Sequence, residues 1–292
     1  VYEGDNFAIV ILELNGPVRR VVHAWTTQAS DHKQMLADKR NGKLENGNLL
    51  TIDVENDYYH YCVRKIRNLM KRFPCEFIAI DPQGGGRAII EAFMDQTKLR
   101  ENESLILPSI EPEERAKETD MMTGLHIIKI INFTSNWISD ANHALKKDME
   151  DKSVMFPFTD EISYALAEYY DESSGESGTL YDTLDDCIYE IDELKKELTT
   201  VVITETSTGK EKFDTPSVKM GINKKGRLKK DRYSALLLSN WVARNIILDE
   251  TQFSNPDTKT MSGFVATGKN KGSLYVGNAK IAKQLQSLYD LE

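Results

Sequence analysis

Short apolar runs alternate along the chain with stretches of helical spacing. Residues 7–14, FAIVILEL, form a near-continuous apolar run with β-branched side chains, which predicts a buried strand. Asn15-Gly16-Pro17 is a turn signal, so residues 18–25 are expected to form a second, antiparallel strand. Residues 30–50 are mostly polar and predict a loop.

The next segment has the order strand–helix–strand–helix. Residues 57–73 carry apolar side chains at helical spacing, with Asp57 placed to cap the helix and Pro74 to end it. Residues 75–81 predict a strand, and residues 87–96 predict a helix after three glycines. This order predicts a mixed α/β sheet flanked by helices.

Weaker patterns follow in the second half of the chain. Residues 105–108 predict a short strand, and residues 126–133 fit either a strand or the start of a helix. The remaining expected elements are helices at 136–150, 182–198 and 233–247, a short edge segment at 154–158, and a hairpin of 199–206 with 210–216 around a Ser-Thr-Gly turn.

Composition narrows the class of protein. The 292 residues are 40% hydrophobic and 28% charged, typical of a globular protein, and no apolar run is long enough to cross a membrane. The three cysteines lack a CxxC pair, so reduced cysteines are expected rather than a structural zinc site. The net charge is −9, and residues 158–197 are densely acidic, which predicts either a solvated helical face or a partner surface.

The stretch FIAIDPQGGGRAIIEAF at 77–93 is the first candidate for chemistry. Asp81 is placed where a buried strand ends at its C-terminal end, the edge at which open α/β sheets gather ligands. Gly84, Gly85 and Gly86 predict a flexible turn that lets a backbone or a phosphate approach closely. The alternative is a structural junction in which Asp81 only forms an Asx-turn.

A second carboxylate, Asp231, begins a strongly apolar helix inside the basic segment 224–232. Asp231 could simply cap that helix. If it meets Asp81, however, the two carboxylates would bind hard divalent cations, and two such ions can drive phosphodiester hydrolysis. The cations expected to hold the DNA backbone, if they are not merely a solvated loop, are Lys224, Lys225, Arg227, Lys229 and Lys230.

Three segments between residues 3 and 244 resemble a known family in order and spacing. IAIDPQGGGRAIIEAF resembles the second acidic motif of the nuclease domain of phage terminase large subunits, and KKDRYSALLLSNWVAR resembles its last acidic motif. EGDNFAIVILEL resembles the segment after the first acidic motif. The resemblance implies a ribonuclease-H-like fold and a two-metal endonuclease, using Mg²⁺ or Mn²⁺, that cuts concatemeric duplex DNA during viral genome packaging.

The resemblance also sets the expected organisation. Residues 1–292 would be a single nuclease domain, with 157–228 as an insertion or accessory region. The first catalytic aspartate is expected either before Val1, on a central strand of the sheet, or to be replaced by Asp5, so the chain is expected to be incomplete at its N-terminus. Implied partners are duplex DNA, an upstream ATPase domain of the same polypeptide, the portal protein and the small terminase subunit, in the host cytoplasm.

Two other functions fit the same sequence. One is a ribonuclease-H-like junction resolvase or integrase-type recombinase. The other is a non-catalytic domain that binds DNA or docks on the viral portal, which the absence of the first carboxylate strand favours.

Overall fold

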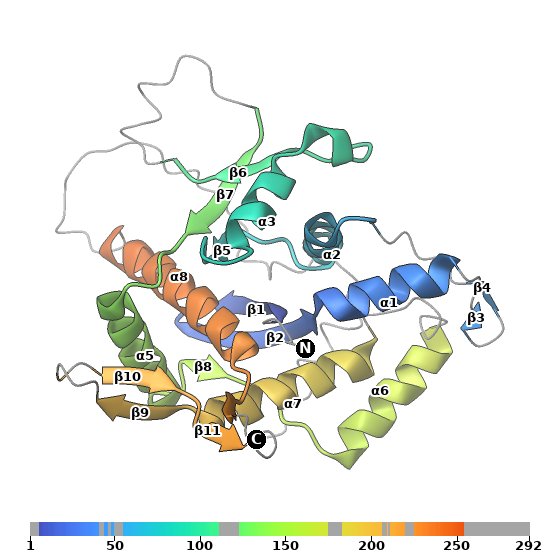
Figure 1. Ribbon diagram of the computed structural model, residues 1–292. Helices are drawn as coiled ribbons and strands as arrows, with labels where there is room; N and C mark the ends of the chain where they lie inside the picture. The colour runs from blue at the N-terminus through green and yellow to red at the C-terminus, as the bar shows by residue number, and fades with distance from the viewer. Residues whose placement is uncertain are drawn as a thin grey trace.

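The computed structural model describes residues 6–40, 55–110, 123–174, 183–205, 209, 211–219 and 225–253, together with a short strand pair at 44–45 and 48–49. Within these residues the protein is a mixed α/β structure with two three-stranded sheets and seven α-helices (Figure 1). The helices are α1 (Ala29–Arg40), α2 (Tyr58–Arg72), α3 (Gly86–Phe93), α5 (Ser135–Glu150), α6 (Glu161–Ser174), α7 (Leu184–Thr200) and α8 (Asp231–Phe253).

The first sheet has the order β1-β2-β8. Strands β1 (Phe7–Asn15) and β2 (Val18–Thr27) form the predicted antiparallel pair, and Gly16 supplies the positive φ of +59° in the turn between them. Strand β8 (Val154–Met155) pairs in parallel with the start of β2. The prediction of two antiparallel strands from the runs on either side of Asn15-Gly16-Pro17 is therefore confirmed.

The second sheet is entirely parallel and has the order β5-β7-β6. Its strands are β5 (Ile78–Ile80), β7 (Leu125–Ile130) and β6 (Ile106–Pro108). Residues 126–133, for which the sequence left strand and helix open, thus contribute mainly to a strand. Helix α3 follows β5 directly, as predicted.

Three two-stranded ladders complete the β structure of the described residues. They pair β3 (Leu44–Glu45) with β4 (Asn48–Leu49), β9 (Val202–Glu205) with β10 (Glu211–Asp214), and β11 (Ser217–Lys219) with β12 (Lys225–Arg227). The β9–β10 ladder is the hairpin that the sequence predicted.

The helix boundaries show one correct and one wrong prediction. Asp57 caps α2 as expected, because its side chain accepts hydrogen bonds from the N–H groups of Tyr59 and His60. The loop predicted for residues 30–50 is wrong over residues 30–40, which form most of α1. Tertiary packing explains the difference: His32 is buried, and Met35 and Leu36 pack against the core formed with α2.

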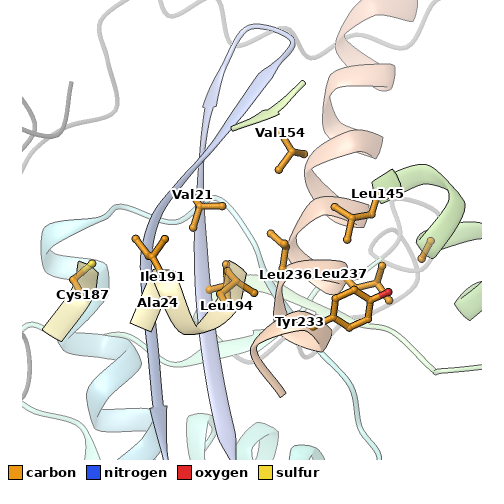
Figure 2. Packing of buried hydrophobic residues seen from close by; sticks show 12 residues of the cluster. Val21, Ala24, Leu145, Val154, Cys187, Ile191, Leu194, Tyr233, Leu236 and Leu237 are labelled. Atoms are coloured by element: carbon orange, nitrogen blue, oxygen red, sulfur yellow. The ribbon is translucent and has the colours of Figure 1, made fainter. Parts of the chain in front are cut away.

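Apolar side chains cover both faces of β1. On one face Phe7 and Ile9 pack into a core made with α2, α3 and the second sheet. On the other face Val10 and Leu12 pack into a core that includes residues of α5, α7 and α8. Figure 2 shows this second core, in which Leu194 of α7 and Leu236 of α8 lie between β2 and the body of α8, and Leu237 lies on the side of α8 that is near Leu145 of α5. The chain therefore builds helical layers on both sides of β1 and β2.

A buried polar cluster ties α5 and α8 to β2 within the second core. The Asp148 carboxylate accepts hydrogen bonds from Arg19 at 2.9 Å and from the Asn240 side-chain amide at 3.0 Å, and it also pairs with Arg244. Arg19, Asp148 and Asn240 are all at least 95% buried. Each charge in this cluster therefore depends on its partners for the hydrogen bonds that water would otherwise provide.

Replacing Asp148 should consequently be costly. We expect Asp148→Ala to lower the free energy of unfolding by about 3–5 kcal/mol, because it leaves the buried Arg19 guanidinium with a hydrogen bond to Asn240 but without a carboxylate to balance its charge. Glu150→Ala, on the same helix, removes only an exposed ion pair with Lys146 and should cost at most about 0.5 kcal/mol. Urea unfolding of both variants measures the difference, and equal stability losses would contradict the role given to Asp148.

Candidate metal and nucleic-acid site

One cleft, with a volume of about 2070 Å³, lies between the two three-stranded sheets and beside α8. Its lining includes residues 6–14 at the start of the first sheet, residues 73–81 before and within β5, and one side of α8. Asp81 and Asp231 both line this cleft, as do the three glycines and Lys229 and Lys230. The two carboxylates singled out from the sequence are therefore brought to the same hollow of the molecule.

Asp81 follows the last residue of β5, at the C-terminal end of that strand. Its Oδ1 accepts a hydrogen bond from the backbone N–H of Gln83 at 3.0 Å, so the Asx-turn that was the structural alternative is present. Within the described residues Oδ2 has no hydrogen-bond partner. The turn thus fixes the orientation of the carboxylate and leaves one oxygen available to a cation.

Local backbone geometry explains why glycines follow Asp81. Gly84 adopts a φ of +59°, which favours glycine. At Gly86, an added Cβ would lie 1.7 Å from the carbonyl oxygen of Asp81, so only glycine fits. The turn predicted as flexible therefore holds the end of β5 against the start of α3, and the close approach that its glycines allow is that of the chain's own backbone.

Asp231 is the first residue of α8, where a negative charge is favoured by the helix dipole. Its Oδ2 accepts the backbone N–H of Asn6 at 3.0 Å, and Lys229 donates a hydrogen bond to the side-chain oxygen of Asn6 at 2.8 Å. Asn6 therefore connects the start of β1 to the start of α8. Sequence reasoning missed this role, since an asparagine before a strand is also a common turn residue.

The basic segment is only partly available for binding phosphate. Lys230 donates a hydrogen bond to the carbonyl of Phe213 at 2.9 Å and lies 3.3 Å from Asp214. Partial burial raises the pKa of Asp214, but contacts with Lys212 and Lys230 outweigh it and hold the pKa below its usual range. Lys230 thus has a structural role in attaching the segment before α8 to β10.

Four predicted site residues remain, two in a short strand and two outside the described residues. Lys225 and Arg227 lie in the short strand β12. Asp5 and Lys224 lie outside the residues that the structure describes. Their assignment to catalysis and to DNA binding stays a prediction.

A largely buried ion cluster lies next to Asp231 and was not predicted. Arg232 donates hydrogen bonds to Glu190 at 2.7 Å and to Glu197 at 2.9 Å. Burial raises the pKa of Glu197 despite the hydrogen bonds from Tyr233 and Arg232, and the charge of Asp231 raises it further. The cluster joins the first turn of α8 to α7, so it holds Asp231 in position.

The described side chains supply only part of the ligands of a metal centre. Among the described residues, no three His, Cys, Asp or Glu side chains cluster closely enough to hold a metal ion. The two carboxylate oxygens fit the preference of Mg²⁺ and Mn²⁺ for oxygen ligands, but a further ligand would have to come from elsewhere. In the same part of the chain, no helix combines the length and apolar character needed to span a membrane.

Comparisons with known proteins do not assign the chain to a family. The chain matches no family model, no curated protein and no solved structure.

The glycine turn offers a direct test of the local geometry. We expect Gly86→Ala to destabilise the protein by about 1–3 kcal/mol or more, because its Cβ would collide with the backbone of Asp81. Gly85→Ala is the matched control: its φ is −79°, and its Cβ would meet only the half-exposed ring of Tyr59, at 3.0 Å. Urea unfolding should separate the two variants, and an unchanged Gly86→Ala would show that the turn relaxes easily.

Proposed function

We propose that this chain is a metal-dependent endonuclease module of a viral DNA-packaging terminase, with a ribonuclease-H-like arrangement. The observation that carries the proposal is that Asp81 and Asp231, from the end of a strand and the start of a helix, line the same cleft. Both carboxylates are held by backbone N–H groups, from Gln83 and Asn6 respectively. Two such carboxylates on rigid elements supply part of the oxygen ligand set that a hard divalent cation needs.

In this proposal Asp81 and Asp231 hold Mg²⁺ or Mn²⁺, and Asp5 or an upstream aspartate completes the ligand set. The bound ions would activate water and stabilise the leaving oxygen of a phosphodiester. Lys229 lies beside Asp231 through their shared partner Asn6, so it is the best placed of the described cations to contact a DNA phosphate. Lys224, Lys225 and Arg227 would extend the contact along the duplex.

The architecture is compatible with this function. The antiparallel pair β1–β2, the parallel strands beginning with β5, and helices on both faces are elements that a ribonuclease-H-like fold also uses. The proposed partners are duplex DNA, an ATPase domain of the same polypeptide, the portal protein and the small terminase subunit, in the host cytoplasm.

Plasmid cutting tests the proposed chemistry. With Mn²⁺ the protein should convert supercoiled plasmid to open-circular and linear DNA, and EDTA should stop the reaction. Asp81→Asn and Asp231→Asn should each slow cutting by about 100-fold or more, because each removes a charged metal ligand worth several kcal/mol. Glu91→Gln is the control, since Glu91 is an exposed carboxylate on α3 that does not line the cleft.

Other outcomes would identify the competing functions. Normal cutting by Asp81→Asn would remove Asp81 from the site. A strong preference for four-way junctions over linear duplex would favour a resolvase or recombinase. If calorimetry detects no Mn²⁺ binding and the protein still binds DNA or portal protein, the chain is a docking domain instead.

A further inference from the structure

We propose that the cleft between β1 and β5 binds an extended apolar polypeptide strand, which pairs with the outer edges of both strands. Strand β1 is the first strand of its sheet and pairs along its length with β2. Strand β5 is the first strand of its sheet and pairs with β7. Within the described residues neither strand pairs with another strand along its remaining edge.

Over residues 7–12 the outer edge of β1 lacks the charges and prolines of a protected sheet edge, although the register against β2 has one irregularity there, between Ile11 and Leu12. Edge strands usually carry charges, prolines or bulges that discourage further pairing. Residues 7–12 of β1 contain no charge, and helices cover both faces of the strand. A near-continuous apolar strand covered on both faces is typical of the interior of a sheet.

Strand β5 has the same character. Its residues Ile78, Ala79 and Ile80 carry no charge, and the two isoleucines pack against the core with α2 and α3. All three nevertheless remain only half-buried. Residues 7–9 and 11–14 of β1 are also half-buried, although most of them are apolar.

These two edges line the same cleft, and the walls between them are apolar. Helix α8 contacts both β1 and β5 (Figure 1). It contributes Ala235, Leu238 and Val242 to the lining of the cleft. Met70 and Phe73 line the cleft from the end of α2 and from the residue after it. The cleft therefore combines two rows of strand-edge backbone groups with apolar side chains above and below.

An extended strand can pair with the backbone groups of both edges and also contact the apolar side chains of the cleft, which other occupants cannot do. Buried backbone N–H and C=O groups need partners, and a helix has none to offer because its own are used internally. A second copy of this chain could offer its own β1 or β5, but helices cover the faces of β1 and would prevent it from entering between the sheets. The expected occupant is about five or six residues long, with apolar side chains on both faces.

A synthetic peptide tests this proposal without metal or DNA, so its result is separate from that of the nuclease proposal. The probe is the octapeptide KTVIVIVK with a fluorescent label, and the control is KTVIPIVK, whose central proline cannot donate the required hydrogen bond. We expect saturable binding of the first peptide, one per chain, and at least tenfold weaker binding of the second. Hydrogen exchange should slow at least tenfold for those amides of residues 7–14 and 78–80 that do not already pair with β2 or β7.

A pair of variants locates the binding site. Val242→Glu places a charge in the cleft wall and should weaken binding of KTVIVIVK at least tenfold. Leu248→Glu lies on the same helix at an exposed position outside the cleft lining and should leave binding unchanged. Failure of KTVIVIVK to bind, or equal binding of the proline peptide, would overturn the proposal. The proposal would also be overturned if light scattering detects a dimer without peptide and the edge amides of β1 in that dimer are already protected from hydrogen exchange.

Discussion

The packing of helix α8 across both sheets is the constraint on which the rest of the structure depends. Within the described residues, no backbone hydrogen-bond ladder joins the two three-stranded sheets. Side-chain packing therefore has to hold one sheet against the other. Helix α8 contacts β1, β2 and β5 and buries Leu236 and Leu237 completely or nearly so in the core with α5 and α7. Its first residue is in turn joined to the start of β1 through Asn6.

This arrangement explains why residues far apart in the sequence meet at one cleft. Asp231 is fixed by the start of α8, and the ion cluster of Arg232 with Glu190 and Glu197 fixes that start against α7. Asp81 is fixed by the turn that joins β5 to α3. Neither carboxylate depends on a long flexible loop, so a bound cation would meet ligands whose positions are largely set before binding.

Sequence patterns predicted the elements well wherever apolar periodicity and turn residues agreed. FAIVILEL, the turn signal Asn15-Gly16-Pro17 and the following VRRVVHAW together predicted two antiparallel strands, and Asp57 with Pro74 marked both ends of α2. The pattern failed at α1, because that helix has few apolar residues and is stabilised by contacts of Met35 and Leu36 with a core that the sequence does not reveal. The ion pair of Lys230 with Asp214 could not be predicted from the sequence either, because it depends on where the fold places β10.

If the cleft binds both a cation and a strand as proposed, the two sets of groups that line it would affect one another. Electrostatic attraction between a carboxylate and a cation is weak in water and several times stronger where apolar groups exclude it. A strand filling the apolar part of the cleft would replace water beside β1 and β5, the two strands whose ends lie next to Asn6 and Asp81. The affinity of the carboxylates for a divalent cation should therefore increase when the strand binds. By linkage, the cation should raise the affinity for the strand by the same factor.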